Sequence, residues 1–284
     1  MGFGSEYTDE NGVHQIRHYD FAVELLDQKV KEICGEVWAD EAPILFLTND
    51  KKLNGTLNKR RKRNGEEEHP YIPNFREAIS KKKVYKGTRK GEKPFHFDNL
   101  TIYMLDNYTT IVAEGLEADD MMSVYQCARL DKADTVICSR DKDLRITPGL
   151  HFGWPCGKQP QFGPVVIDEL GYIEVVKGKI KGGGLKFFYS QILTGDTVDN
   201  IPGLEGCGPV KAFKLLNECG SEEELFKATS EAYKAKYGED IWRDDMLEQA
   251  LLVWMVRDID DDGKPVMWTM YDERGVLYGK TIGR

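Results

Sequence analysis

This sequence of 284 residues lacks the features of a membrane or secreted protein. No stretch approaches eighteen consecutive apolar residues, so the sequence predicts no membrane span and no membrane partner. The first residues are polar and lack the apolar run of a signal peptide. We therefore expect a cytoplasmic protein, and no protein partner can be inferred.

Cysteine and histidine patterns that bind metals are also missing. The six cysteines form no C-x-x-C pair, and the five histidines are scattered. Neither set predicts a zinc site, and cysteines inside apolar segments, such as Cys138, are expected to be reduced thiols. No G-x-x-x-x-G-K-[ST] loop occurs, which weakens the hypothesis of a nucleotide-binding regulator.

Positive charge is scarce overall but concentrated in one segment. The net charge of −9, taken alone, argues against a nucleic-acid partner. Residues 51–93, however, hold fifteen Lys and Arg against five Glu, whereas the rest of the chain has 24 basic and 43 acidic residues. Such asymmetry indicates a polyanionic partner. An acidic body can still bind DNA if its acids gather around cations and its basic residues face the phosphates.

Helical and strand patterns alternate over the first two thirds of the chain. The predicted helices cover residues 20–38, 97–108, 117–131 and 184–194. The predicted strands cover residues 43–48, 109–114 and 133–139, with strand-like pieces near 150–153 and 164–168. This alternation favours an α/β fold with a parallel sheet and crossover helices. Loops are predicted at the N-terminus and at residues 51–73, a short helix within 74–94, and a mostly helical region from about residue 196.

Three acidic clusters stand at the ends of apolar elements, in EGLEADD, CSRDKDL and ILTGDTVDNIPG. Each cluster alone is compatible with helix capping or with a solvated turn. Ligands of parallel sheets gather outside the carboxyl ends of the strands, where converging acids would repel one another without cations. Together the clusters predict a site for two Mg²⁺ or Mn²⁺ ions that clamp a phosphodiester. Its ligands would be Glu117, Asp119, Asp120, Asp141, Asp143, Asp196 and Asp199.

Two other segments predict contacts to a nucleic acid. A glycine-rich turn followed by an apolar helix predicts a hairpin at residues 203–216, whose backbone N–H groups can approach a phosphate. The alternative is a plain glycine-rich turn. The basic segment contains YKGTR at residues 85–89, in which Lys and Arg can neutralise phosphate and Tyr can stack on a base. The alternative there is a solvated basic loop.

The combination of these motifs resembles the 5′→3′ exonuclease and flap endonuclease family of the bacteriophage type. The resemblance is carried by EADD at 117–120, SRDKD at 139–143, and GDTVDNIPG at 195–203 running into GCG at 206–208. NFR at 74–76 and YKGTR resemble the pre-arch and arch region of that family, and residues 247–268 resemble the C-terminal tail of its short phage members. The resemblance covers nearly the whole chain.

The resemblance implies a PIN-like fold, with a twisted, mainly parallel, doubly wound sheet, a helical arch and a helical C-terminal DNA-binding region. The corresponding division is an α/β nuclease domain at residues 1–180, which includes the basic arch region 51–94. A helical region at residues 181–284 would contain the helix-hairpin-helix motif at 203–216.

The resemblance also assigns roles to residues. The tighter metal site would consist of Glu117, Asp119, Asp120 and Asp141. The second ion would be served by Asp143, Asp196 and Asp199. The scissile phosphate would be met by Lys86 and Arg89. Other DNA contacts would come from Arg76, Tyr85, Gly203, Gly206, Gly208 and Lys211, with a K⁺ ion at the hairpin.

Two features depart from the family pattern. The family begins with a short apolar strand that carries a metal-binding Asp, whereas this chain opens at MGFGS without such a strand. The family also places an Asp after its second strand, and here either Asp50 or Asn49 can take that position.

The sequence thus predicts a Mg²⁺-dependent 5′→3′ exonuclease or structure-specific endonuclease that acts in phage DNA replication or degradation inside a bacterial host. Its substrate would be a DNA duplex with a 5′ end or flap, or an RNA–DNA hybrid. The alternative is a DNA-binding protein of the same fold whose catalysis is impaired because the first strand and its Asp are missing.

Overall fold

The computed structural model describes residues 5–88, 91–129, 134–271 and 277–278. The chain forms two compact units, the first made of residues 1–74 and 90–118, the second of residues 75–89 and 119–284. The basic segment is therefore divided between both units. Within the described ranges, no helix is both long and apolar enough to cross a membrane.

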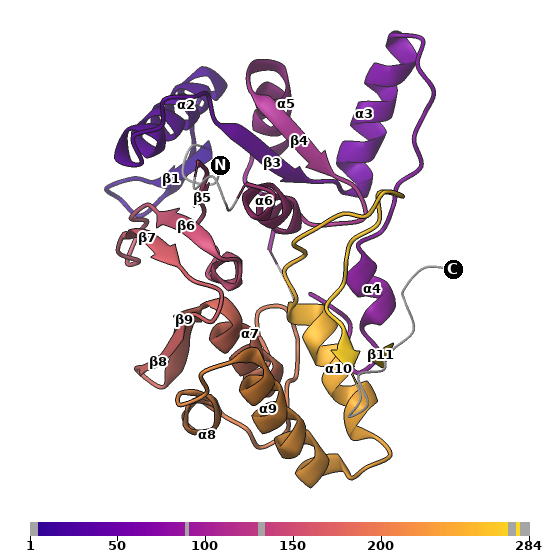
Figure 1. Cartoon of the computed structure of the whole chain (residues 1–284). Coiled ribbons are helices and arrows are strands. Elements are labelled where there is room, and N and C mark those ends of the chain that lie inside the picture. The colour runs from indigo at the N-terminus through magenta and orange to yellow at the C-terminus, as the bar shows by residue number, and fades with distance from the viewer. Residues whose placement is uncertain (1–4, 89–90, 130–133, 272–276, 279–284) are drawn as a thin grey trace. The chain divides into compact units, whose positions relative to one another are not determined.

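The first unit is built on a parallel pair of strands, β3 (Ile44–Thr48) and β4 (Thr109–Ala113). Helices α2 (Tyr19–Glu36) and α5 (Phe97–Asn107) lie beside this pair (Figure 1). Each of these elements was predicted from its apolar spacing. Their apolar faces supply buried side chains, among them Ala22, Leu47, Leu100, Met104 and Ala113.

A short hairpin near the N-terminus replaces the loop predicted there. Strands β1 (Glu6–Thr8) and β2 (His14–Ile16) pair antiparallel. The side chain of Asp9 closes the turn, since its Oδ1 accepts hydrogen bonds from the backbone N–H groups of Asn11 and Val13. This is a turn chemistry that an Asp readily provides.

Helix α3 (Lys51–Arg63) corrects the loop predicted for residues 51–73. Asp50 caps its N-terminus, and the Asp50 Oδ1 accepts a hydrogen bond from the N–H of Leu53 at 2.8 Å. The helix is rich in Lys, Arg and Leu, which are good helix formers. The loop prediction was wrong for residues 51–63, because it gave the single Gly55 and the polar composition more weight than this propensity, whereas residues 64–73 form no helix or strand.

The second unit contains a three-stranded sheet and a hairpin. Strand β5 (Val136–Cys138) pairs parallel with β6 (Gly149–Gly153), which pairs antiparallel with β7 (Phe162–Ile167). Strands β8 (Tyr172–Val176) and β9 (Lys179–Gly183) form an antiparallel hairpin that the sequence pattern did not reveal. Helix α6 (Ala118–Cys127) precedes the sheet, and the 3-10 turn η2 (Asp143–Ile146) follows β5.

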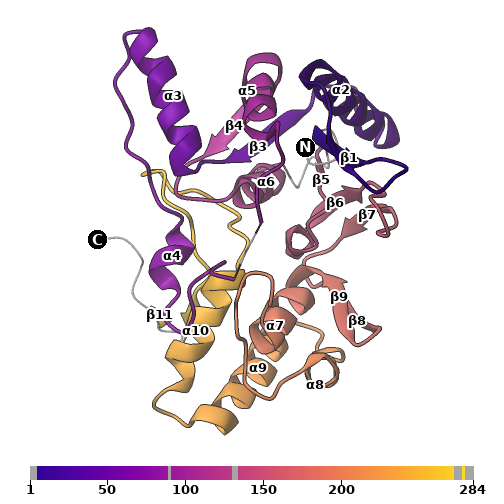
Figure 2. The ribbon, with the colours of Figure 1, turned by 180° about the vertical axis from the view of Figure 1, so that it is seen from behind.

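Helix α7 (Gly184–Thr194) is the centre of the helical part of the second unit. It packs against α8 (Pro209–Leu216), α9 (Glu222–Tyr237) and α10 (Trp242–Val253) (Figure 2). It buries almost its whole surface, including Phe187, Phe188, Tyr189, Ile192 and Leu193. Burying such a side chain contributes roughly 1.5–3 kcal/mol, so this helix is the anchor of the C-terminal region.

Shorter elements complete the described chain. They are α4 (Phe75–Ile79), β10 (Met270–Tyr271) and β11 (Leu277–Tyr278). The predicted α/β class and the helical C-terminal region are confirmed. Over the residues that the structure covers, parallel pairing occurs in β3–β4 and β5–β6, in different units, and the strands form several small sheets.

Candidate active site

The acids of the first unit lie at the carboxyl ends of its two parallel strands. The Oγ1 of Thr48, the last residue of β3, accepts a hydrogen bond from the N–H of Ala118 at 2.9 Å. The N–H of Asn49 donates to the carbonyl of Ala113, the last residue of β4, at 3.0 Å. These bonds hold Glu117 and the segment at Asn49 at the same edge of the strand pair.

Asp50 and Asn49 differ in their surroundings. Asp50 caps α3 and forms an ion pair with Lys93 at 2.5 Å. Burial acts to raise the pKa of Asp50, but hydrogen bonds from Lys93 and Leu53 hold that pKa below its ordinary value. Asn49 is buried, and its Oδ1 has no hydrogen-bond partner among the described residues. Both therefore stay candidates for the ligand position after this strand.

The acids of the second unit begin on α6. Asp119 and Asp120 stand in the first turn of this helix, as the sequence predicted. Asp120 is fully buried and receives two hydrogen bonds from the guanidinium of Arg76, at 2.6 and 2.8 Å. The N–H of Val256 also donates to Asp120 at 3.2 Å. Both carboxylate oxygens of Asp120 thus accept hydrogen bonds from protein donors. This favours a structural role for Asp120 over the expected role as a metal ligand.

Arg76 corrects a second expectation. It was assigned to the DNA-binding surface, yet only 3% of it is exposed. Besides Asp120, its guanidinium donates to the carbonyls of Leu252 at 3.1 Å and Trp254 at 2.6 Å. A guanidinium directed at these partners lies in the interior, where it joins α4, α6 and the end of α10 within the second unit.

The SRDKD motif forms a cluster with residues of the α7 end. The N–H of Asp143 donates to the Asp141 carboxylate at 2.9 Å. The ammonium of Lys142 lies 3.1 Å from Asp143 Oδ1 and 2.8 Å from Asp196 Oδ2. The Nε2 of Gln191 donates to Asp143 Oδ1 at 2.5 Å. The structure therefore brings together one acid from each of two predicted clusters, with Asp141 beside them.

The electrostatics of this cluster reflect burial and crowding of negative charge. Burial, and then the charges of Asp141 and Asp196, raise the pKa of Asp143 to about 6, against the opposing effect of Lys142. Burial also acts to raise the pKa of Asp196, but Lys142 and two backbone N–H groups hold it below its ordinary value. Burial acts to lower the pKa of Lys142, and the two acids outweigh that effect and raise it.

Lys142 and Gln191 are functional candidates that reasoning from the sequence missed. Lys142 stands inside the SRDKD motif, and its position between two acids was the available signal. Gln191 lies on α7, 48 residues from its partner Asp143, so nothing in the sequence pointed to it.

Tyr85 and Lys86, in a turn of the second unit, contact the third acidic cluster. The N–H of Lys86 donates to the carbonyl of Asp199 at 2.9 Å, and its ammonium lies 3.9 Å from the Asp199 carboxylate. The hydroxyl of Tyr85 donates to the same carboxylate at 3.2 Å. Lys86 has a left-handed backbone, with φ of 55°. Arg89, assigned with Lys86 to the phosphate, lies outside the described residues.

The hairpin predicted at residues 203–216 is an ordered turn that leads into α8. Gly203 has φ of 66°, and its N–H donates to the side chain of Gln249 at 2.9 Å. A Cβ on Gly203 would lie 2.3 Å from the N of Gly195, so only glycine fits this close approach. Gly208 caps α8, Pro209 is its first residue, and Lys211 lies in its first turn.

The donor chemistry of the acidic cluster fits a hard divalent cation. Asp141, Asp143 and Asp196 provide oxygen ligands only, which Mg²⁺ and Mn²⁺ prefer. Burial, with a smaller contribution from the charges of Asp141 and Asp196, raises the pKa of Asp143 despite the nearby ammonium of Lys142. Throughout the described ranges, however, no three His, Cys, Asp or Glu side chains are grouped closely enough to hold a metal ion.

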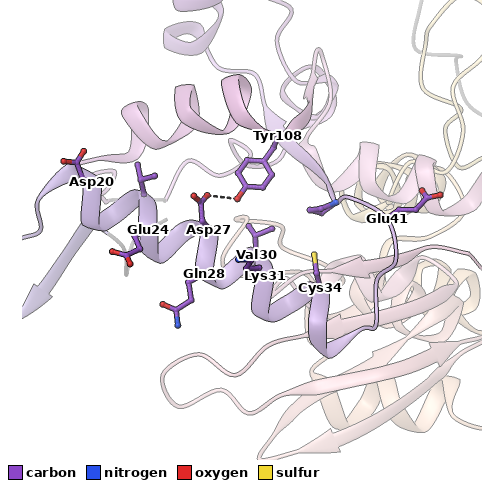
Figure 3. Close-up of a pocket in the computed structure, with 11 residues that line it drawn as sticks. Asp20, Glu24, Asp27, Gln28, Val30, Lys31, Cys34, Glu41 and Tyr108 are labelled. Carbon is purple, nitrogen blue, oxygen red and sulfur yellow. Dashed lines mark hydrogen bonds between the residues drawn. The ribbon is translucent and has the colours of Figure 1, made fainter.

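A separate hollow of about 850 Å³ lies in the first unit, along α2 (Figure 3). Its lining includes Asp20, Glu24 and Glu41, and Asp27 accepts hydrogen bonds from the hydroxyls of Tyr103 and Tyr108 at 2.7 and 2.6 Å. The bond to Asp27, and then burial, raise the pKa of Tyr103 to about 12. The acidic lining would repel a phosphate, so this hollow does not suit a nucleic-acid backbone.

Comparison with known proteins shows similarity to a class of nucleases. Residues 186–270, which cover most of α7 and all of α8 to α10, match the family model "5′-3′ exonuclease, C-terminal SAM fold". This match confirms, over these C-terminal residues, the resemblance to the 5′→3′ exonucleases and flap endonucleases stated above.

Two bacterial proteins are among those with a similar sequence. The chain is 36% identical over 139 residues to DNA polymerase I of Rhizobium leguminosarum, covering 48% of this chain and 13% of that protein. It is 30% identical over 158 residues to flap endonuclease Xni of Colwellia psychrerythraea, covering 51% of this chain and 50% of that protein. The chain thus spans half or less of the length of these relatives.

Solved structures show a more distant similarity. The T5 D15 protein co-crystallised with metal ions matches with a TM-score of 0.39 and 14% identity, over 75% of this chain and 91% of that one. A bacteriophage T5 D15 flap endonuclease in a pseudo-enzyme–product complex with DNA and metal ions matches with a TM-score of 0.36 and 15% identity, over 74% and 99%.

Proposed function

We propose that this chain hydrolyses phosphodiester bonds of DNA as a divalent-metal-dependent 5′→3′ exonuclease or flap endonuclease. The observation that carries the proposal is the acidic cluster of Asp141, Asp143 and Asp196 in the same unit as the contact between Lys86 and Asp199. Carboxylates that hold cations and a lysine that binds phosphate are the two parts that such a reaction needs. The relatives support the direction of attack from a 5′ end or flap.

The proposed ligands divide into two groups. The tighter site would use Glu117, Asp119 and Asp141, with Asp50 or Asn49 as a further ligand. The second site would use Asp143, Asp196 and Asp199. When bound, two such cations stabilise the attacking and leaving oxygens of the phosphodiester. Asp120 would position α6, and therefore Asp119, through its ion pair with Arg76.

The proposed DNA contacts lie outside the acidic cluster. Lys86 and Arg89 would neutralise the scissile phosphate, and the Tyr85 ring would stack on a terminal base. The turn of Gly203, Gly206 and Gly208 and the side chain of Lys211 would bind the duplex backbone, with a K⁺ ion as in the family. An RNA–DNA hybrid is a second substrate to be tested, and the bacterial cytoplasm is the compartment we propose.

A chelation experiment tests the reaction. The purified chain, treated with EDTA and dialysed, should leave a 5′-flap DNA labelled at its 5′ end intact. Addition of Mg²⁺ or Mn²⁺ should restore cleavage that starts at the 5′ side, and Ca²⁺ should support binding without cleavage. Full activity after exhaustive EDTA treatment would falsify the metal-dependent mechanism.

The absence of a pre-assembled group of three ligands in the described part of the chain favours a second candidate. This candidate is a DNA-binding protein of the same fold with impaired catalysis. It predicts that the chain retards flap DNA in a gel-shift assay yet leaves it uncut at saturating Mg²⁺ and Mn²⁺. The same assay therefore separates the two functions.

A further inference from the structure

The ammonium of Lys142 lies between the carboxylates of Asp143 and Asp196. It approaches Asp143 Oδ1 at 3.1 Å and Asp196 Oδ2 at 2.8 Å. The two acids belong to different segments of the second unit, η2 and the turn after α7. A single positive charge therefore bridges two carboxylates that would otherwise repel each other.

The two acids and the lysine differ in their access to solvent. The side chain of Asp196 is 9% exposed and that of Asp143 is 25% exposed, whereas that of Lys142 is 51% exposed. The acids are also fixed by other bonds, since Asp196 Oδ1 accepts the N–H of Val198 at 2.7 Å and Asp143 Oδ1 accepts Gln191. The two carboxylates are thus held in place, whereas the side chain of Lys142 can move away from them into solvent.

A lysine suits such an exchange. Its ammonium is a compact, strongly hydrated point charge on a flexible stem, and it can swing into solvent at little cost. A carboxylate pair that loses this ammonium needs another cation, because buried negative charge without a partner is strongly unfavourable. The oxygens that Lys142 bridges are the oxygens that a shared divalent cation would use.

We propose that Lys142 is an internal counter-ion of Asp143 and Asp196 and that a divalent cation must displace it to bind these two acids. The inference rests on the metal site of the proposed function and adds a residue that lowers the affinity of that site. Lys142 keeps the acids together when divalent cations are scarce. It thereby sets the cation concentration at which the second site fills.

Removal of the ammonium tests this inference. Lys142→Met should melt at a lower temperature than the unsubstituted chain in EDTA, because Asp143 and Asp196 then repel each other. It should bind Mn²⁺ more tightly in isothermal titration, on the order of tenfold, which corresponds to about 1.4 kcal/mol. Lys142→Arg, which keeps the charge, should restore an affinity near that of the unsubstituted chain. Lys158→Met removes an equal charge from an exposed turn and should change neither property.

The outcomes distinguish this inference from the proposed function. Equal or weaker Mn²⁺ binding by Lys142→Met, when the unsubstituted chain binds Mn²⁺, overturns the role of Lys142 and leaves the metal site standing. Absence of Mn²⁺ binding in the unsubstituted chain overturns both. A loss of packing alone would lower the melting temperature but would not tighten metal binding.

A measurement on the unsubstituted chain covers the case in which the variant does not fold. A lysine-acylating ester, followed by peptide mass spectrometry, reports how accessible each ammonium is. Saturating Mg²⁺ should accelerate the acylation of Lys142 severalfold and leave that of Lys158 unchanged. An unchanged or slower reaction at Lys142, with Mg²⁺ bound, contradicts the displacement.

Discussion

The guanidinium of Arg76 and the carboxylate of Asp120 face each other across two hydrogen bonds of 2.6 and 2.8 Å, and both side chains are buried. The pair joins the short helix α4 to helix α6, which also carries Asp119. Because Arg76 also binds two carbonyls at the end of α10, three segments that are distant in sequence meet at one guanidinium. A charge pair in this position orders the surroundings of the proposed site without touching a substrate.

Removing either partner of this ion pair should lower the free energy of unfolding. Removing one partner leaves an uncompensated buried charge, which destabilises a protein by about 3–5 kcal/mol. We expect Asp120→Asn and Arg76→Met each to lower the free energy of unfolding of the second unit by about that amount in urea titrations. The double variant should lose less than the sum of the two, because no lone charge remains.

An exposed pair provides the control. Lys236 and Glu205 lie 3.1 Å apart with exposed side chains, and replacing both should change the unfolding free energy by less than about 1 kcal/mol. If the losses of the two buried variants simply add, the pair does not act as a unit. The folded fraction of Asp120→Asn should still bind Mn²⁺, since its role is positioning.

The spacing of apolar residues along the sequence predicted those helices and strands that depend mainly on residues close together in the chain. Helix α7 was placed at residues 184–194 because its apolar residues form one long helical run, and its bounds agree. Helix α3 was missed because a capping Asp and a high content of Lys and Arg outweighed one glycine. The roles of Arg76 and Asp120 could not be predicted, since burial and a partner 44 residues away leave no local trace. Lys142 was visible in its motif, but only the structure shows which acids it bridges.

Loss of a proposed ligand should separate catalysis from binding. We expect Asp119→Ala and Asp141→Ala to abolish cleavage of flap DNA and to leave its dissociation constant within roughly threefold in Ca²⁺, because these acids hold cations rather than phosphates. Any change in binding should be a tightening, since a negative charge near the DNA is removed. Glu231→Ala, on the exposed face of α9, should retain full activity. Unsubstituted turnover rates in both ligand variants would refute the assignment.

The arch lysine should contribute one phosphate contact. Lys86→Ala should weaken DNA binding and reduce the slope of log K against log salt by roughly one, since each neutralised phosphate releases counter-ions. Arg89→Ala should have the same effect. Binding is measured by fluorescence anisotropy between low and moderate salt, with Lys158→Ala as the matched control. An unchanged slope in both arch variants would identify the segment as a solvated basic loop.

Acid should destabilise the second unit through His151. This residue lies on β6 with 3% of its surface exposed, and its Nε2 bonds to the carbonyl of Thr147 at 2.8 Å. Burial lowers its pKa from 6.5 to about 4, with a smaller contribution from the charge of Arg145 and an opposing one from Thr147. The folded state therefore keeps the ring neutral at pH values where the unfolded chain already takes up a proton.

The sign of the pH effect follows from the lowered pKa of His151. The stability linked to His151 is fully present above pH 6.5 and is lost as the pH falls toward about 4. A pKa difference of about 2.5 corresponds to about 3 kcal/mol, at roughly 1.36 kcal/mol for each pH unit. We expect His151→Gln to show a flatter fall of unfolding free energy between pH 7 and 4 than the unsubstituted chain. His18→Gln, at an exposed histidine, should reproduce the unsubstituted curve. Asp143 and other acids titrate in all three proteins, so the difference between the curves of His151→Gln and the unsubstituted chain isolates His151. If these two curves run parallel, folding does not lower the pKa of His151 and the prediction fails.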